Sequence, residues 1–550
     1  MTPKPLLTYS IRILFWGLAL SLLFYRVLIG VDFGDESFHL ATAYHFDLGA
    51  EAFKDESSVG QMFAFFTLPL LKIVRSFAPD NEGLVLKMRW GFLLFHTLFF
   101  LLLYQTLKVF TVGSRWILEL ACLASLFFIP ANVFSLHYAP LGFMFLGSSL
   151  CTRFLSQKKE SRLLLFASGI LLGMGTLAHP GILLPALFLI LVTPNQRVLF
   201  LSGILMAWTL LMVIFQFSLM DYAHAVMTTR EAVGQQGNSL GLIRLKNLLM
   251  ELFPQGPLAG ILILWLASFL FCFKKNQVAV QLALLLIFPA LVFFNSRVSH
   301  GGTGSSGYVL SLVYLSPFLC SSLADRGQLK AYFLDFWVPC LCAFLACSFL
   351  STGGVAGTSG SFLTLLPFSL AFLSESVKRL LGSRNNLGYR WVPALPLVLF
   401  GCFFLIATFK GVYQENLFGA PLKAEVRSGP FKGLRTTETK RDFIESFQQD
   451  LKSLPLKRGR IVFSCFFPAG YLLTGFFPNH DLLWHAPKPS EIRADTDLVV
   501  RLYDEVYPTI NVWPQKCSPL PEVIRGHKGT LLRRDRYELW IKDKSSSYPE

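Results

Sequence analysis

The residues best suited to chemistry form a short polar motif, Gly34-Asp35-Glu36-Ser37-Phe38-His39, which follows the first long apolar stretch of the chain. On a helix, Asp35 and His39 lie four residues apart and share a face, whereas Glu36 points about 100° away. An aspartate at a helix start stays ionised because the helix dipole favours the anion, so Asp35 suits a general base acting on a hydroxyl group. Two other readings stay open. Asp35 and His39 could hold a divalent cation, or Asp35 could be a helix N-cap with Glu36 as a first-turn dipole partner.

Cationic and imidazole side chains near the ends of apolar stretches are candidates for binding a phosphate group. Lys87 and Arg89 lie at the predicted outer end of the second membrane span. Arg297 and His300 lie in the glycine-rich segment Asn295–Gly307, where backbone N–H groups can approach an anion. The alternative for both arginines is a side chain that snorkels from a span end to the membrane surface.

Two further histidines are candidate site residues. His137 lies in Ser135-Leu136-His137-Tyr138-Ala139-Pro140, and His179 precedes Pro180-Gly181. His179 could contact a ligand near the outer membrane face, or it could be a satisfied imidazole at a helix break.

The elements that position these residues are membrane spans. The chain of 550 residues is 53% hydrophobic and 15% charged, and it contains 54 Phe, which is more apolar surface than a soluble core of this length needs. Hydropathy predicts about thirteen spans, near residues 11–30, 88–107, 116–132, 139–155, 163–178, 181–193, 198–219, 257–273, 277–294, 308–323, 331–350, 362–377 and 391–409.

The placement of charge predicts the orientation. Alternate loops carry Lys or Arg, as cytoplasmic loops do, whereas the first loop on the other side, 31–86, holds nine Asp or Glu and three Lys or Arg. The N-terminus is therefore expected in the cytoplasm, and residues after 410 outside. The net charge of +15 is dispersed among these loops and does not indicate a nucleic-acid partner.

We expect a transmembrane domain over 1–409, a connector over 410–439 and a small extracytoplasmic α/β domain over 440–550. In the outer loop, Asp35–Phe46 is predicted to be an amphipathic helix, with Phe38, Leu40, Ala41 and Phe46 resting on the membrane surface. In the C-terminal part the pattern predicts one helix and three strands, at Lys440–Leu454, Arg460–Phe467, Leu498–Tyr503 and Glu538–Lys542. An oxidising compartment would permit a disulfide between Cys465 and Cys517.

The acidic pair after the first span, the acidic outer loop, the number of spans and the outer domain together resemble the GT-C glycosyltransferases. These include the protein O-mannosyltransferases (glycosyltransferase family 39) and the lipid A aminoarabinose transferases. Asp35-Glu36 matches their acidic pair in type and place. Gly173–Gly181 looks like their small-residue-rich helix ending in Lys-Pro, with His179 where Lys is usual, and Leu86–Trp90 resembles the entry to their second span.

The resemblance implies a polyprenyl-phosphate-linked sugar as donor, a lipid, glycan or protein acceptor, and activation of the acceptor by Asp35. Glu36 and His39 would orient Asp35 or the acceptor, and a divalent cation is the one cofactor to consider. The middle loops lack a eukaryotic-style insertion, which favours a bacterial inner membrane.

The chain departs from the family pattern at one place. Many relatives carry a second acid in the outer loop after the third span, where this chain has His137 and no carboxylate. The alternatives are a carrier or flippase for lipid-linked saccharides, and a family member that binds lipid without turnover. A carrier predicts ionisable residues deep within spans and two related halves, and the sequence shows neither.

Overall fold

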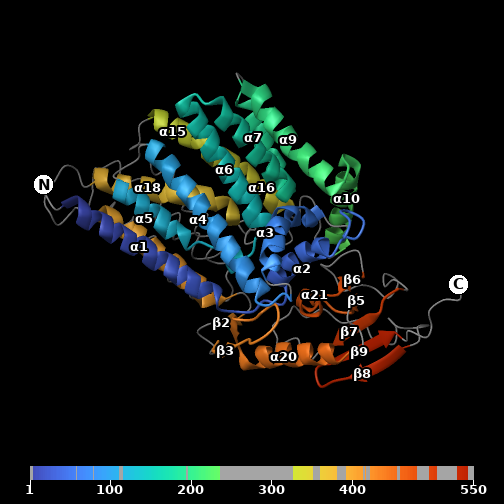
Figure 1. Ribbon diagram of the computed structural model, residues 1–550. Helices are drawn as coiled ribbons and strands as arrows, with labels where there is room; N and C mark the ends of the chain where they lie inside the picture. Colours follow the sequence, from blue (N-terminus) through green and yellow to red (C-terminus); the bar gives the residue numbers. More distant parts are fainter. Residues whose placement is uncertain are drawn as a thin grey trace.

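The computed structural model describes residues 4–56, 59–77, 80–110, 115–193, 196–235, 326–350, 359–380, 392–412, 415–416, 422–454, 459–479, 495–503 and 529–542. Within these ranges a bundle of helices is joined to a smaller part that contains a β-sheet (Figure 1).

Every apolar stretch predicted within the described ranges forms a helix. The bundle helices are α1 (Lys4–Val27), α4 (Leu84–Phe110), α5 (Arg115–Leu126), α6 (Tyr138–Lys159), α7 (Arg162–Ala178), α8 (Leu183–Leu191), α9 (Arg197–Phe215), α10 (Leu219–Gln235), α15 (Arg326–Tyr332), α16 (Val338–Leu350), α18 (Phe362–Leu380) and α19 (Leu395–Lys410). The stretches predicted at 257–273, 277–294 and 308–323 lie outside the described residues.

The bundle presents apolar side chains to its surroundings. Four helical segments are long and apolar enough to cross a membrane: Leu84–Phe110, Arg197–Phe215, Lys330–Leu350 and Val392–Phe409. Leu94 on α4 and Val213 on α9 are 58% and 70% exposed, which suits contact with lipid rather than water. The chain is therefore an integral membrane protein. The count of thirteen spans and the orientation remain predictions.

Small residues let α7 approach its neighbours closely. A Cβ atom added at Gly169 would lie 2.2 Å from the carbonyl oxygen of Phe200 on α9. On the α6 side, the Ser149 hydroxyl donates to the Ser168 carbonyl at 2.8 Å. Close packing of small residues and interhelical hydrogen bonds replace the hydrophobic effect inside a bilayer. They fix the end of α7, from which His179 projects.

The first outer loop folds into α2 (Asp35–Asp47), the 3-10 turn η1 (Val59–Phe63) and α3 (Ala64–Ser76). The predicted position of α2 on the membrane surface is wrong, because α2 is buried on all faces from Glu36 to Phe46. It packs against α3 and against α21 (Pro468–Thr474) of the C-terminal part, so its apolar residues contact protein. In Figure 1, α2 lies between the bundle and the strands.

The C-terminal part contains one five-stranded sheet in the order β6-β5-β7-β9-β8. Strand β5 runs parallel to β6 and β7, whereas β9 runs antiparallel to β7 and β8. The elements of this part are β1 (Gly411–Val412), β2 (Glu415–Asn416), β3 (Ala424–Glu425), β4 (Arg435–Thr436), α20 (Glu438–Ser453), β5 (Arg460–Phe463), α21, β6 (Phe477–Pro478), β7 (Leu498–Leu502), β8 (Gly529–Arg533) and β9 (Tyr537–Lys542). The expected helix and three strands coincide with α20, β5, β7 and β9.

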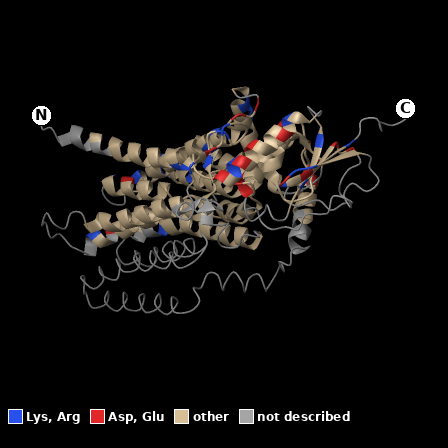
Figure 2. Cartoon of the chain, turned by 90° about the horizontal axis from the view of Figure 1, so that it is seen from below, with Lys and Arg blue, Asp and Glu red and all other residues tan. Residues whose placement is uncertain are grey.

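In Figure 2 the positions of charged residues, blue and red on the ribbon, gather on the C-terminal part and at helix ends, and the body of the bundle is mostly tan. This contrast agrees with a membrane-embedded bundle and a water-exposed C-terminal part. Cys465 is disulfide-bonded, and Cys517 lies outside the described residues. The domain boundaries stay predictions.

The C-terminal part holds the segment that precedes Asp35. The Arg435 backbone exchanges hydrogen bonds with the carbonyl of Leu28 at 2.7 Å and the N–H of Gly30 at 2.8 Å. The buried Lys440 ammonium donates to the Val31 carbonyl at 2.8 Å. Phe33 is fully buried, and its ring contacts three aromatic rings of the C-terminal part, those of Phe431, Phe443 and Phe467. These contacts of the C-terminal part fix the residues that lead into the start of α2.

We expect Phe33→Ala to cost about 3–5 kcal/mol, because it removes the aromatic contacts and leaves a cavity. The measurement is the thermal midpoint of the purified chain by intrinsic fluorescence. Phe77→Ala is the control, since Phe77 is 82% exposed, and it should leave the midpoint within about a degree. Equal midpoints for the two variants would contradict the docking described here.

Candidate active site

A buried ion pair joins α2 to α4. The Arg89 guanidinium donates to both oxygens of the Glu36 carboxylate, at 2.7 and 2.5 Å. Its other N–H groups donate to the carbonyls of Val27 at 2.7 Å, Ile29 at 3.3 Å and Gly30 at 2.9 Å. Arginine has five N–H donors, so every one of them has a protein acceptor. Both side chains are 5% exposed.

This geometry bears on two predicted roles. With all its donors directed at protein atoms, Arg89 is placed to hold α2 and the 27–30 segment rather than to present N–H groups to a donor phosphate. Glu36 is paired bidentately with the Arg89 guanidinium. In this structure both side chains therefore bind protein atoms, and their roles in a reaction stay predictions.

Asp32 caps α2, a role that the sequence analysis missed. Its carboxylate accepts the N–H groups of Gly34 at 2.8 Å and Glu36 at 2.6 Å. Burial, together with the neighbouring charge of Asp35, raises the pKa of Asp32 to about 8, although these N–H bonds favour the anion. The N-cap reading of Asp35 is wrong, because Asp35 is the first helical residue and Gly34 the N-cap. In the sequence, the sign that could have indicated this role was an aspartate placed three residues before the first helical residue.

Asp35 differs from both neighbouring carboxylates. It is partly exposed, and the described part of the chain places no hydrogen-bond donor against it. Burial raises the pKa of Asp35 to about 6, above the value that the helix dipole alone would give. At neutral pH most of the population is therefore ionised, and the pKa lies in the range that suits a general base.

Three histidines from three segments surround the ring of Tyr138. His39 on α2 and His137 in the loop before α6 stack in parallel, with centroids 4.3 Å apart and an interplanar angle of 2°. The Tyr138 ring lies 5.5 Å from His39, 5.2 Å from His137 and 5.5 Å from His179. Tyr138 is also within electrostatic range of the Asp35 carboxylate. The structure thus brings four predicted site residues, Asp35 among them, around one tyrosine.

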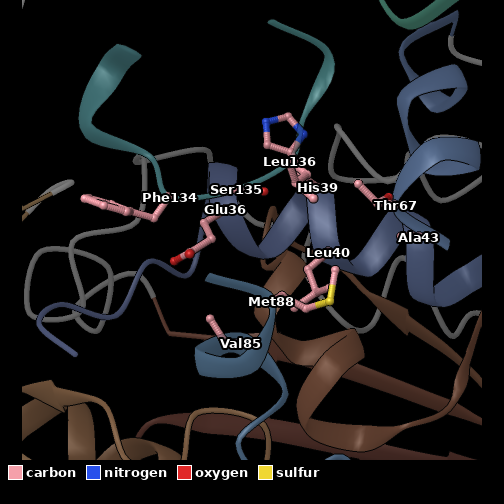
Figure 3. Close-up of a pocket in the computed structure, with 10 residues that line it drawn as sticks. All are labelled: Glu36, His39, Leu40, Ala43, Thr67, Val85, Met88, Phe134, Ser135 and Leu136. Carbon is pink, nitrogen blue, oxygen red and sulfur yellow. The ribbon is translucent and has the colours of Figure 1, made fainter. Parts of the chain in front are cut away.

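Cavities adjoin this cluster on the α4 side. One has a volume of about 20 Å³, enough for one water molecule or hydroxyl group, and includes His39 and Glu36 in its wall, as Figure 3 shows. The side chain of His39 points away from that of Glu36 in this view. The complete lining is Glu36, His39, Leu40, Ala43, Thr67, Val85, Met88, Phe134, Ser135 and Leu136. A second cavity, of about 10 Å³, is bounded by Asp32, Glu36 and Arg89.

Of the remaining predicted residues, Lys87 lies apart from this cluster, and His179 within it also has a local backbone contact. Lys87 is half-buried, and its ammonium donates to the Glu82 carbonyl at 2.9 Å. The Nδ1 atom of His179 accepts the N–H of Gly181 at 3.2 Å, so this imidazole caps the helix break. Arg297 and His300 fall within 236–325, which the structure does not describe.

A metal site is not assembled within the part of the chain that the structure describes. No group of three or more His, Cys, Asp or Glu side chains there converges in a way that could hold an ion. Asp35 and His39 supply two potential ligands, fewer than a stable site needs.

Comparison with known proteins finds a similarity in the overall path of the chain. No protein-family model and no curated protein matches the chain. Two solved structures of ArnT from Cupriavidus metallidurans, an aminoarabinose transferase, are similar over nearly the full length. The apo structure is 12% identical with a TM-score of 0.42, covering 99% of this chain and 100% of its own. The structure bound to undecaprenyl phosphate is 13% identical with a TM-score of 0.41, covering 98% and 99%. Similarity at this level assigns no activity, which has to come from the residues themselves.

Glu36→Gln should destabilise the protein by about 3–5 kcal/mol, because it leaves the Arg89 charge buried without its anion. The readout is the thermal midpoint at fixed detergent and salt. Glu51→Gln is the control, since its pair with Lys54 is exposed, at 63% and 75%, and such pairs contribute about 0–1 kcal/mol. A Glu36→Gln midpoint within a degree of wild type would remove the ion pair from its structural role.

Proposed function

We propose that this protein transfers a sugar from a polyprenyl-phosphate-linked donor to an acceptor hydroxyl at the extracytoplasmic face of a bacterial inner membrane. The observation that carries the proposal is the unpaired, partly exposed Asp35 carboxylate at the start of a buried helix. Leaving a carboxylate without a partner costs free energy, and the structure keeps its two acidic neighbours, Asp32 and Glu36, satisfied. A charge left unpaired among satisfied ones is typical of a group reserved for a reaction.

In the proposed reaction, Asp35 accepts the proton of the acceptor hydroxyl. The resulting oxygen nucleophile attacks the anomeric carbon of the donor from the face opposite the phosphate. The bond from the anomeric carbon to the phosphate oxygen breaks, and polyprenyl phosphate leaves with both electrons of that bond. The configuration at the anomeric carbon inverts, and the proton on Asp35 passes to solvent. A phosphate is a good leaving group, so cations suffice to stabilise it, and Lys87, Arg297 and His300 are the candidates.

The supporting residues keep the base in place. Arg89 fixes the rotation of α2 through Glu36, and Asp32 fixes its first turn. Asp35 lies between these anchors in the sequence, so its backbone is held while its side chain stays accessible. Such preorganisation places a base without a reorganisation cost during the reaction.

Asp35→Asn should lower the rate of sugar transfer at least about a hundredfold, because the amide cannot accept the proton. The assay is transfer of radiolabelled sugar from polyprenyl-phosphate donors in membranes with matched protein levels. The variant should be at least as stable as wild type at pH 7.5, since it removes the burial cost that raises the pKa of Asp35. Asp80→Asn, an exposed acid of the same loop, is the control and should keep full activity. An unchanged rate in Asp35→Asn would exclude it as the base.

The rate should also depend on pH and should fall on the acid side of about pH 6. The base works in its ionised form, and burial raises the pKa of Asp35 to about 6, so kcat/KM should be constant above that pH and fall about tenfold per unit below it. The measurement is the pH profile of kcat/KM in liposomes. A limb near the ordinary aspartate value, about 4, would show that burial of Asp35 has no bearing on the reaction.

A further inference from the structure

The His39–His137 stack contains polar atoms that neither the fold nor the proposed proton transfer uses. Nδ1 of His39 and both ring nitrogens of His137 are buried and lack a hydrogen-bond partner in the described part of the chain. His39 is 4% exposed and His137 is 7% exposed. Leaving a buried polar atom without a hydrogen bond costs free energy, because the atom has lost its contact with water. A phenylalanine at position 137 would stack on the His39 ring equally well and would have no ring nitrogens to leave unpaired. Packing alone therefore does not account for a histidine at this position.

The rings are uncharged at neutral pH. Burial lowers the pKa of His39 well below its ordinary value, and burial also lowers the pKa of His137 to about 3. Parallel stacking at 4.3 Å would in addition place two positive charges face to face. The stack therefore suits an uncharged partner, in contrast to the arginine and lysine side chains that suit a phosphate.

A neutral imidazole offers one N–H donor and one acceptor. A hydroxyl group needs that same combination, because it both donates and accepts. Further hydroxyls line the adjoining cavity, those of Ser135 and Thr67, beside the apolar side chains of Leu40 and Met88. Mixed hydroxyl and apolar surfaces of this kind bind polyhydroxylated rings, which have polar edges and apolar faces.

We propose that the His39–His137 stack is a subsite for an uncharged hydroxyl group of a sugar ring, one helical turn beyond Asp35. This inference rests on the proposed function, since it places the sugar next to the base, and it adds a positioning residue, His137. The subsite selects a neutral hydroxyl and discriminates against a charged substituent at that position of the sugar.

The test uses the full-length chain in nanodiscs and the methyl glycosides of common hexoses and pentoses as probes. Binding is followed by saturation-transfer NMR, which requires no turnover. Wild type and Asp35→Asn should bind at least one glycoside equally, and His137→Phe should bind it about tenfold more weakly, the loss of a hydrogen bond or two. His137→Phe should also have a higher thermal midpoint than wild type, because it removes two unsatisfied nitrogens.

His96→Phe is the matched control. His96 is a buried histidine among aromatic rings, and its Nε2 atom lies 3.0 Å from the Leu126 carbonyl oxygen. The same substitution there should lower the midpoint and leave glycoside binding unchanged. With an active donor–acceptor pair, His137→Phe should raise the KM for the sugar-bearing substrate and change kcat far less.

The possible outcomes test the sugar subsite independently of the transfer reaction. Equal binding by wild type and His137→Phe, as expected if ordered water alone satisfies the rings, overturns the subsite. So does the absence of binding of every probe to wild type. Binding that depends on His137 in a protein that transfers no sugar keeps the subsite and rejects the proposed function.

Discussion

The pairing of Arg89 with Glu36 is the interaction on which the arrangement of the site depends. A buried arginine is stable only if all its donors find acceptors, and here the acceptors come from two places, the end of the first membrane helix and the first turn of α2. One side chain on α4 therefore sets the distance between the membrane bundle and the outer loop. It also gives the Glu36 carboxylate a bidentate partner, which sets Glu36 apart from the neighbouring Asp35.

The C-terminal part completes this arrangement from the other side. Lys440 and the backbone of Arg435 bind the same short segment that Arg89 binds, and Phe33 is embedded in the aromatic core beneath it. A loop of this kind would ordinarily move on the membrane surface. Held between two rigid bodies, it can keep an unpaired carboxylate and two unpaired imidazoles in place, because the surrounding contacts offset their cost.

The sequence allowed the helices, the acidic motif and the main strands to be predicted, because each is a local pattern. An apolar run of membrane length forms a helix wherever it packs, and β5, β7 and β9 follow β-rich runs. The surroundings of α2 could not be predicted in the same way. Its apolar residues fit a membrane surface and a protein interior equally well, and only the docking of α21, more than 400 residues later, decides between them. The partners of Arg89 and the stacking of His39 on His137 likewise join residues that are distant in the chain.

The first turn of α2 shows why residue type alone does not assign a role. Asp35 and Glu36 are adjacent and chemically alike, yet helical geometry turns them about 100° apart, so that Glu36 meets a buried guanidinium and Asp35 is partly exposed. Neighbouring carboxylates with different environments can take different tasks. His137 extends the same argument. Burial lowers the pKa of the His137 imidazole, so this ring offers a neutral donor and acceptor rather than a positive charge. In the reaction proposed above, Asp35 is the base, and the neutral imidazole beside it favours an uncharged hydroxyl group.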